Sequence, residues 1–410
     1  MKHIVVLSEM YYPVMGAPSA VFDKYLKLLK EEYQFHIITL ERELYLTPSK
    51  EYDLHYVTSY RNRLGMKCMY NIDHHRHFLV NKILYFFLRV CTAIQTQYAF
   101  PNSKKWEVDA YYNKMKELYI TFHFDTIIAI SDYYLSQLAA RKFKKEYPSV
   151  KWILFATDPF SENYVYYNRK LFKPLWKWMN KRAEQKLYND ANYCMLTKEL
   201  YSYVLNNYTI DKNKIATIHY SLSNRLAGRV FQHDNHSDCK LIFAGFVYKK
   251  IRNPEFALSV LSKVEGVHVD LFITEGECED IINRYVSDKI CREGFVSRDR
   301  YEKMIREEYD ILLNIGNISS LQSPSKMLEL LSTGKPIINF YYMEDTLYDM
   351  IGKYPLGLNI QNGDNGAIRK VEQFCKEMKG KMIPFTEVEK LYPENNIYKQ
   401  AELLKSMIEA

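Results

Sequence analysis

QSPSKMLELLSTGKPIINF, residues 322–340, predicts a short helix followed by a buried strand. Ser323 can cap this helix, because its hydroxyl can accept a hydrogen bond from a free amide of the first turn. Pro324 fits the first helical position, where no donor is needed, and Gly334 fits the left-handed residue just beyond the helix end. Residues 337–340 are typical of a strand in a covered parallel sheet. The stretch therefore predicts a helix–strand unit of an α/β fold.

One face of this helix indicates a ligand site. Lys326 and Glu329 are three positions apart and therefore share a face. A helix start with free amides, here around Ser325, and a nearby lysine attracts anions such as phosphate. A carboxylate one turn deeper can accept hydrogen bonds from two vicinal hydroxyls, and a phosphate beside a diol describes a nucleotide. The alternative is an ordinary surface helix whose Lys326–Glu329 pair contributes only about 0.2–0.5 kcal/mol. The apolar residues of the helix are left to face the core: Met327, Leu328 and Leu331.

The pattern PSK-x-x-E-x-x-x-x-GKP of residues 324–336 resembles the donor-site segment of GT-B glycosyltransferases, especially bacterial enzymes that build polysaccharides. The resemblance implies that Glu329 holds the ribose of the nucleotide and that Lys326 faces the diphosphate, with Ser323 and Ser325 at the same helix start. Many retaining members carry a second glutamate eight residues earlier, where this chain has Leu321. The usual contact to the donor sugar, and with it the stereochemical outcome, is therefore not implied.

Length and composition indicate a globular protein of two domains. The chain has 410 residues, of which 47% are hydrophobic, and a net charge of +7. The positive charge mildly favours anionic partners such as phosphates or lipid headgroups, and we find no motif for nucleic-acid binding. The seven cysteines are scattered and never form C-x-x-C, which fits a reducing cytoplasm and argues against a zinc site. The N-terminus lacks the cleavage site of a secretory signal.

The first half of the chain alternates strands and helices, which predicts a doubly wound parallel sheet within residues 1–223. The loop around Gly16 should line a cleft at the end of the first strand. It resembles the glycine-containing first loop of GT-B enzymes, which approaches the donor phosphates and the acceptor. Asp158 follows a predicted strand, where catalytic groups of such sheets lie, or else it caps a turn before Pro159. His219 follows the last strand of this half and either contacts the acceptor or has a structural role.

Residues 78–98 predict a helix rich in large apolar residues, interrupted by Asn81, Lys82 and Arg89. We interpret the stretch as too short and too polar to span a bilayer. A basic amphipathic helix of this kind can lie on an anionic membrane surface. The alternative is a helix that packs into the N-terminal domain with a solvated basic edge.

Residues 224–238 are polar and lose periodicity, so we expect a linker there. Strands and helices then alternate again, which predicts a second Rossmann-like domain over residues 239–392. Residues 393–410 predict a final helix, and the resemblance implies that this helix crosses back to the first domain.

The loop after the first strand of the second domain carries positive charge to the mouth of the sheet. Gly245 permits close approach of the backbone, and Lys249, Lys250 and Arg252 follow it. The fork of an arginine suits bidentate contact with phosphate. The resemblance assigns the arginine of this loop to neutralising the leaving diphosphate, and Arg252 has the better position. A solvated basic loop is the alternative.

These features together predict a GT-B fold, in which two Rossmann-like doubly wound parallel-sheet domains face a deep cleft. We expect a glycosyltransferase that moves a sugar from a nucleotide-diphosphate sugar, first of all a UDP-sugar, to a glycan or lipid-linked acceptor in surface polysaccharide (capsule) synthesis. Arg252, Lys326 and the Ser325 amide would stabilise the departing diphosphate. Asn317 would lie near the donor sugar, and Asp158 would be the acceptor base.

This scheme needs no metal ion and no cofactor besides the nucleotide sugar, because the cationic side chains neutralise the diphosphate and no D-x-D pair lies in a suitable loop. We expect a cytoplasmic protein that is peripheral on the inner face of the cell membrane.

Two alternative functions stay open. A sugar-nucleotide epimerase of the same architecture would convert the donor without an acceptor, and a non-catalytic membrane-associated partner protein would not bind nucleotides.

Overall fold

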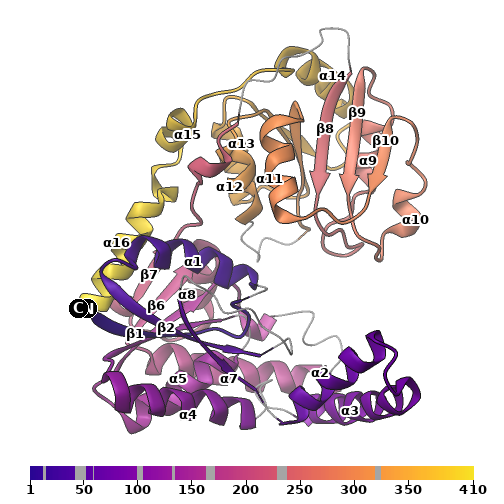
Figure 1. Ribbon diagram of the computed structural model, residues 1–410. Coiled ribbons are helices and arrows are strands. Elements are labelled where there is room, and N and C mark those ends of the chain that lie inside the picture. The colour runs from indigo at the N-terminus through magenta and orange to yellow at the C-terminus, as the bar shows by residue number, and fades with distance from the viewer. Residues whose placement is uncertain are drawn as a thin grey trace. The chain divides into compact units, whose positions relative to one another are not determined.

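The computed structural model describes residues 1–12, 15–41, 52–58, 60–98, 105–131, 134–162, 171–228, 238–318 and 325–410. Its contacts divide the chain into two compact units, Met1–His219 with Tyr398–Ala410, and Tyr220–Ile397. Each unit is built on a parallel sheet flanked by helices (Figure 1). The prediction of two doubly wound parallel sheets is confirmed.

The division between the units differs in detail from the expected domain boundaries. It falls after His219, whereas we expected a linker at residues 224–238. The short 3-10 helix η3 (Asn224–Leu226) belongs to the second unit, and residues 229–237 lie outside the described part of the chain. The last helix, α16 (Ile397–Glu409), is grouped with the first unit except for its first residue.

The first unit contains a seven-stranded sheet in the order β3-β2-β1-β4-β5-β6-β7, with every pair of neighbours parallel. Its strands are β1 (Lys2–Leu7), β2 (Tyr33–Leu40), β3 (Asp53–Val57), β4 (Thr126–Ile130), β5 (Lys151–Ala156), β6 (Tyr193–Thr197) and β7 (Ile215–Ile218). Besides α16, its helices are α1 (Ala17–Leu29), α2 (Tyr60–Asp73), α3 (Phe78–Tyr98), α4 (Lys105–Phe122), α5 (Leu135–Glu146), η1 (Phe160–Glu162), α7 (Lys173–Asp190), α8 (Lys198–Asn207) and η2 (Lys212–Lys214).

Helices α4 and α5 pack on one face of the sheet, where Tyr111 and Phe143 are fully buried. On the opposite face, Phe22 of α1 meets Phe155 edge to face, with 4.7 Å between ring centroids. Because helices cover both faces, the strands are apolar runs without alternation.

The second unit contains a six-stranded parallel sheet in the order β10-β9-β8-β11-β12-β13. Its strands are β8 (Cys239–Ala244), β9 (Val267–Phe272), β10 (Ile290–Glu293), β11 (Ile311–Ile315), β12 (Ile337–Tyr341) and β13 (Gly357–Gln361). Besides η3, its helices are α9 (Glu255–Leu261), α10 (Glu279–Ile282), α11 (Arg298–Glu307), α12 (Ser325–Ser332), α13 (Thr346–Lys353), α14 (Ala367–Met378), α15 (Phe385–Leu391) and η4 (Pro393–Asn395).

The order of the second sheet reverses at β8, which lies between β9 and β11. In doubly wound sheets, ligands bind outside the carboxyl ends of the strands at such a switch point. Gly245 and Gly316 directly follow β8 and β11, and the Gly316 amide donates to Phe340 O of β12 at 2.7 Å. The ends of β8 and β11 therefore mark where a ligand of this unit should bind.

Three asparagines form a ladder across the strands beside this point. Asn314, Asn339 and Asn359 stand directly opposite one another on β11, β12 and β13. Asn314 Nδ2 donates to Asn339 Oδ1 at 2.7 Å, and Asn339 Nδ2 donates to Asn359 Oδ1 at 2.8 Å. Asn359 Nδ2 in turn donates to Tyr348 O at 2.9 Å. A satisfied chain of amides inside a sheet fixes one register, because a shift by one residue would leave buried polar groups unpaired.

Helix α12 and strand β12 form the helix–strand unit predicted from residues 322–340. Met327, Leu328 and Leu331 are buried in the core of the second unit, as predicted. Gly334 has φ +73°, the left-handed conformation expected just past the helix. Ser323 and Pro324, the expected cap and first helical residue, lie outside the described residues.

Helices α2 and α3 form a hairpin at the edge of the first unit (Figure 1). Arg61 of α2 donates to Leu88 O and Thr92 Oγ1 of α3, each at 3.0 Å. The residues of α3 that are half-buried recur at helical spacing: Asn81, Tyr85, Leu88, Thr92 and Gln95. The remaining faces of α3 are exposed, with 71% of Leu79 and 63% of Phe86 open to solvent.

The stretch Phe78–Gln95 of α3 is long and apolar enough to cross a membrane, and none of it is buried inside the structure. The sequence-based interpretation that this stretch is too short and too polar to span a bilayer does not hold by length and composition. The 18-residue window contains only two charged residues.

Gly334→Ala is expected to lower the free energy of unfolding of the second unit by about 3 kcal/mol or more. An alanine Cβ would lie 2.0 Å from Ile383 O, and the left-handed φ adds roughly 1–2 kcal/mol for a residue with a side chain. Gly266→Ala is the matched control, because its φ is +68° and no atom of the described residues lies within 4 Å of the added Cβ. Urea denaturation followed by circular dichroism measures both losses. Equal losses in the two variants would contradict the role given to Ile383.

Candidate functional site

Gly245, at the carboxyl end of β8, gives two cationic side chains access to one point. Its φ is +153°, a value that residues with side chains rarely adopt. A Cβ placed on this residue would lie 3.3 Å from Lys326 Nζ and 3.8 Å from Arg252 Nη1. The missing side chain therefore leaves space beside the backbone that both cations border.

Arg252 is held in place from both strands that flank the switch point. A short antiparallel bridge joins it to Tyr248, with Tyr248 N donating to Arg252 O at 3.0 Å. Arg252 Nε donates to Asn317 Oδ1 at 3.0 Å, just beyond β11, and Arg252 Nη1 donates to Phe246 O at 3.4 Å. Burial lowers the pKa of this guanidinium, but an arginine remains charged at neutral pH. The structure therefore fixes a positive charge at the end of β8.

Lys326 supplies the second charge from the first turn of α12. Its Nζ lies 5.0 Å from the centroid of the Tyr301 ring, on α11. Burial lowers the pKa of Lys326 to about 8, Glu329 opposes this shift, and Arg252 and Arg298 add to it. The Lys326 side chain is therefore mostly protonated at pH 7, and it loses its proton as the pH rises through about 8.

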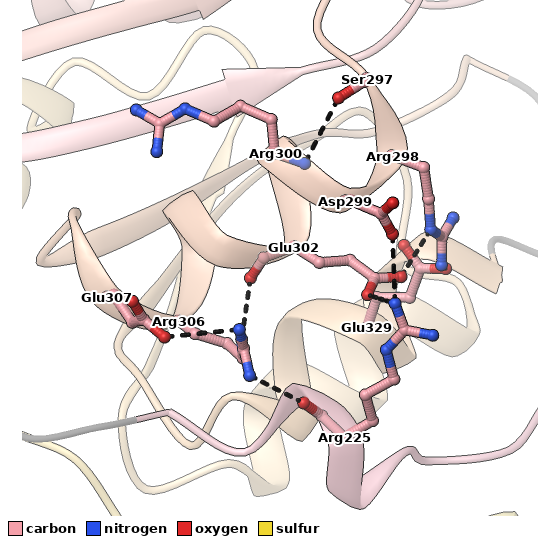
Figure 2. Close-up of polar contacts among 9 residues, drawn as sticks. All are labelled: Arg225, Ser297, Arg298, Asp299, Arg300, Glu302, Arg306, Glu307 and Glu329. Carbon is pink, nitrogen blue, oxygen red and sulfur yellow. Dashed lines mark hydrogen bonds and ion pairs between the residues drawn. The ribbon is translucent and has the colours of Figure 1, made fainter.

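Glu329 lies one turn further along α12 and forms an ion pair with α11 (Figure 2). Arg298 Nη2 donates to Glu329 Oε1 at 2.6 Å, and Arg298 Nε donates to Glu302 Oε1 at 2.7 Å. Arg225 Nη2 reaches Glu302 Oε2 at 2.9 Å and Asp299 Oδ1 at 3.3 Å. The side chain of Glu329 is only 14% exposed, so its orientation is set by this network.

Arg298 is a residue that the sequence analysis missed. Ser297 caps α11, with its hydroxyl accepting from Arg300 N, and this places Arg298 in the first turn facing α12. The pair of Arg298 and Glu302, four positions apart, was a readable helical pair. Its link to Glu329 spans 31 positions in sequence and could not be read from spacing.

The other expected residues of the second unit have different surroundings. Lys249 Nζ lies 2.8 Å from Asp280 Oδ1, and both side chains are exposed. Asn317 is buried and orients Arg252. Ser325 begins the described part of α12, so its backbone lies at the helix start, while Ser323 falls outside the described residues.

Three expected residues belong to the first unit. Gly16 precedes α1 with φ −67° and ψ 158°, an extended conformation open to any residue. Asp158 is exposed after β5 and accepts a hydrogen bond from Thr157 Oγ1 at 3.0 Å. The His219 backbone amide donates to Gln400 Oε1 of α16 at 3.1 Å, an anchor for the end of the unit. Arg252, Lys326 and Glu329 belong to the second unit.

Two groups of side chains in the described part of the chain have the spacing to hold a metal ion: His36 with Asp53 and His55, and His268 with Asp270 and Cys291. Neither group includes Arg252, Lys326 or Glu329. Both escaped the sequence analysis, which considered cysteine pairs and D-x-D.

The chain is similar to known proteins in its structure. No family model matches the chain, and no curated protein matches it in sequence. Among solved structures, Anabaena HepE in complex with UDP matches with TM-score 0.63 and 9% identity, covering 100% of both chains. TarM matches with TM-score 0.64 and 11% identity over 100% of this chain and 99% of its own. WaaG, a glycosyltransferase involved in lipopolysaccharide biosynthesis, matches with TM-score 0.60 and 12% identity over 99% of both chains.

These matches cover both units, and they show the fold. The chain has the GT-B architecture of two Rossmann-like α/β domains, and the predicted fold class is confirmed. The cationic point at Gly245 lies at the switch point of the second of these domains.

Arg298→Ala is expected to lower the free energy of unfolding by about 1–2 kcal/mol. The substitution leaves Glu302 and Glu329, whose side chains are 10% and 14% exposed, without their shared cation. Arg300→Ala is the control on the same helix. Its partner Glu308 is 32% exposed, so a loss below about 0.5 kcal/mol is expected. Chemical denaturation of both variants measures the difference, and a loss for Arg298→Ala no larger than the control would refute a stabilising role.

Proposed function

We propose that this chain is a glycosyltransferase that moves a sugar from a nucleotide-diphosphate sugar to a glycan or lipid-linked acceptor of a surface polysaccharide such as capsule. The observation that carries the proposal is that Arg252 Nη1 and Lys326 Nζ both lie within 4 Å of a Cβ position on Gly245. Two cations at the switch point of a parallel sheet suit a diphosphate. Glu329, one turn beyond Lys326, would then hold the ribose hydroxyls.

The chemistry requires stabilisation of a departing diphosphate. The bond between the anomeric carbon and the diphosphate oxygen breaks, and the diphosphate keeps its electron pair. A bond forms between that carbon and the acceptor hydroxyl oxygen, whose proton passes to a base, for which we propose Asp158. Arg252 and Lys326, with the amide of Ser325, would stabilise the developing negative charge and make a metal ion unnecessary.

The remaining parts of the proposal follow from this site. HepE has been solved with UDP and with UDP-glucose, which supports uracil as the first nucleotide base to test. Gly16 and His219 are proposed to lie on the acceptor side, and closure of the two domains would exclude water and limit hydrolysis of the donor. Asn317 would act through Arg252 by holding the guanidinium toward the diphosphate.

UDP is expected to bind the full-length protein equally well in EDTA and in magnesium chloride, because the two side-chain cations replace the metal. Arg252→Ala should weaken binding by about tenfold or more, through loss of charge-assisted hydrogen bonds. Lys249→Ala is the control from the same loop and should change the affinity by less than about twofold, since its ammonium is paired with Asp280. Isothermal titration calorimetry measures the affinity for UDP of the wild-type protein and of both variants.

A strict requirement for magnesium would contradict the metal-free scheme. Equal losses of UDP affinity in the Arg252 and Lys249 variants would indicate that UDP is attracted only by diffuse positive charge. A product assay with the donor alone separates transfer from epimerisation, because only an epimerase converts the donor without an acceptor.

The affinity for UDP should fall as pH rises through about 8, where Lys326 loses its charge. The protonated lysine binds the diphosphate better, so the Kd should be constant near pH 7 and rise by about tenfold between pH 8 and 9.5. The terminal phosphate does not contribute, because its second pKa is about 6. Lys326→Arg keeps its charge throughout and should give a flat profile. Titration calorimetry over this range is the measurement, and a flat wild-type profile would remove Lys326 from the diphosphate site.

We further propose that α3 binds an anionic membrane surface, which would bring a lipid-linked acceptor to the enzyme and make the protein peripheral on the inner face of the cell membrane. Ile83, Phe86 and Phe87 expose 59%, 63% and 61% of their surfaces. Lys82 and Arg89 are exposed on the same helix, which carries no acidic residue. An exposed apolar face flanked by cations fits anionic lipid better than it fits water.

Co-sedimentation with anionic phosphatidylglycerol vesicles at low salt should recover the wild-type protein. Phe86→Glu combined with Phe87→Glu should lower the partition coefficient by at least about tenfold, because each buried phenylalanine contributes roughly 1.5–3 kcal/mol. Ile120→Glu on α4, a position 72% exposed, is the control and should leave sedimentation unchanged. Failure of the wild-type protein to sediment would end the membrane proposal without affecting the nucleotide site.

A further inference from the structure

Two neighbouring strands of the first sheet bring three donor side chains to one place. His36 of β2 stands opposite Asp53 of β3 in the parallel register, and His55 is two residues further along β3. His36 Nδ1 lies 2.8 Å from Asp53 Oδ2, and His55 Nε2 lies 3.3 Å from the same oxygen. Two imidazoles and a carboxylate thus converge on the same face of the sheet.

The separations between these atoms suit a divalent transition-metal ion. All three donor atoms lie within 4.8 Å of one another. Zinc binds imidazole nitrogen and carboxylate oxygen at about 2.0–2.2 Å, so tetrahedral ligands lie roughly 3.3–3.5 Å apart. Small shifts of the side chains would admit an ion held by two imidazoles, one carboxylate and a water.

His55 has a polar atom that its protein surroundings do not satisfy. Within the described part of the chain, its Nε2 is buried and makes no well-aligned hydrogen bond, although Asp53 Oδ2 lies 3.3 Å away. A buried polar atom without a partner destabilises the folded state. A metal ion would use the lone pair of this nitrogen.

The environment of His36 is that of an oriented ligand. Its Nε2 lies 2.9 Å from His3 Nδ1 of β1, and either nitrogen can be the donor. The ring stacks on Phe122 of α4, with 4.3 Å between centroids. A hydrogen bond to the second ring nitrogen directs the first nitrogen toward a metal. His36 is fully buried, whereas the Asp53 side chain is 43% exposed, which leaves an ion a path from solvent.

We propose that His36, Asp53 and His55 form a binding site for a divalent transition-metal ion, with Zn²⁺ as the probe. The ion would tie β3, the terminal strand of the described sheet, to β2 and through His3 to β1. Its role is structural and independent of the proposed sugar transfer, because His36, Asp53 and His55 are not among the residues proposed for donor binding, acceptor binding or catalysis.

The second donor group of the chain is a poorer fit and serves as the control. Asp270 Oδ2 already accepts a hydrogen bond from Tyr309 OH at 2.6 Å. Burial raises the pKa of the Cys291 thiol, whereas metals bind the thiolate. His268→Ala therefore removes a histidine beside an aspartate without removing a competent site.

The test is isothermal titration of ZnCl₂ into the untagged full-length protein after treatment with a chelator. One ion per chain should bind, with a Kd below about 10 μM. Asp53→Asn and His55→Ala should each weaken binding by about a hundredfold or more, and His268→Ala should bind as the wild type does. Saturating Zn²⁺ should raise the melting temperature of the wild type by roughly 5–10 °C and leave that of Asp53→Asn unchanged.

The proposal is overturned if the wild-type chain binds no stoichiometric zinc, or if Asp53→Asn binds it as tightly as the wild type does. Loss of binding in His268→Ala alone would assign the ion to the other group and overturn it too. Circular dichroism of the metal-free variants separates lost ligands from lost folding. If His55→Ala does not fold, Asp53→Asn decides the question, because its side chain is partly exposed and the substitution keeps its size.

Discussion

Two like charges held at one point of the second unit are the constraint around which its site is built. Arg252, in the loop after β8, and Lys326, in the first turn of α12, are 74 positions apart in the chain, yet both border the space left by Gly245. Unit charges several ångströms apart repel by about 2 kcal/mol at an effective dielectric constant near 20. The lowered pKa of Lys326 reflects its burial first and this repulsion after it. An anion between the two side chains would remove the repulsion, and a diphosphate has the size and charge to do so.

The surrounding structure resists the separation of these charges. Asn317 and the bridge to Tyr248 hold Arg252 against the ends of β8 and β11. The amide ladder from Asn314 to Asn359 locks β11, β12 and β13 in register, so the strand that follows α12 cannot slide. Arg298 holds Glu329 from the neighbouring helix. The site is therefore pre-organised by contacts that lie outside the residues expected to touch the ligand.

Local patterns predicted the elements well, because their causes are local. The helix–strand unit of residues 322–340 and the left-handed Gly334 follow from local periodicity and backbone preferences, and the structure confirms them. Long-range partners were not predictable in this way. The pairing of Lys249 with Asp280 and of Arg298 with Glu329 depends on which helices the fold brings together. A single sequence gives no distance across 31 positions.

The His36 group shows the same limit from another side. Its ligands are spread over residues 36–55, with His3 added from the first strand, and no spacing motif links them. Only the parallel register of β1, β2 and β3 places them on one face. In both units, the strand order brings together functional side chains that are far apart in the sequence.

A crystal structure of the protein with bound UDP tests most directly whether Arg252 and Lys326 hold one diphosphate. We expect diphosphate oxygens at about 2.7–3.1 Å from the Arg252 guanidinium and the Lys326 ammonium, with the ribose hydroxyls at the carboxylate of Glu329. A nucleotide bound elsewhere, or one whose phosphates touch neither cation, would contradict a diphosphate site at Arg252 and Lys326.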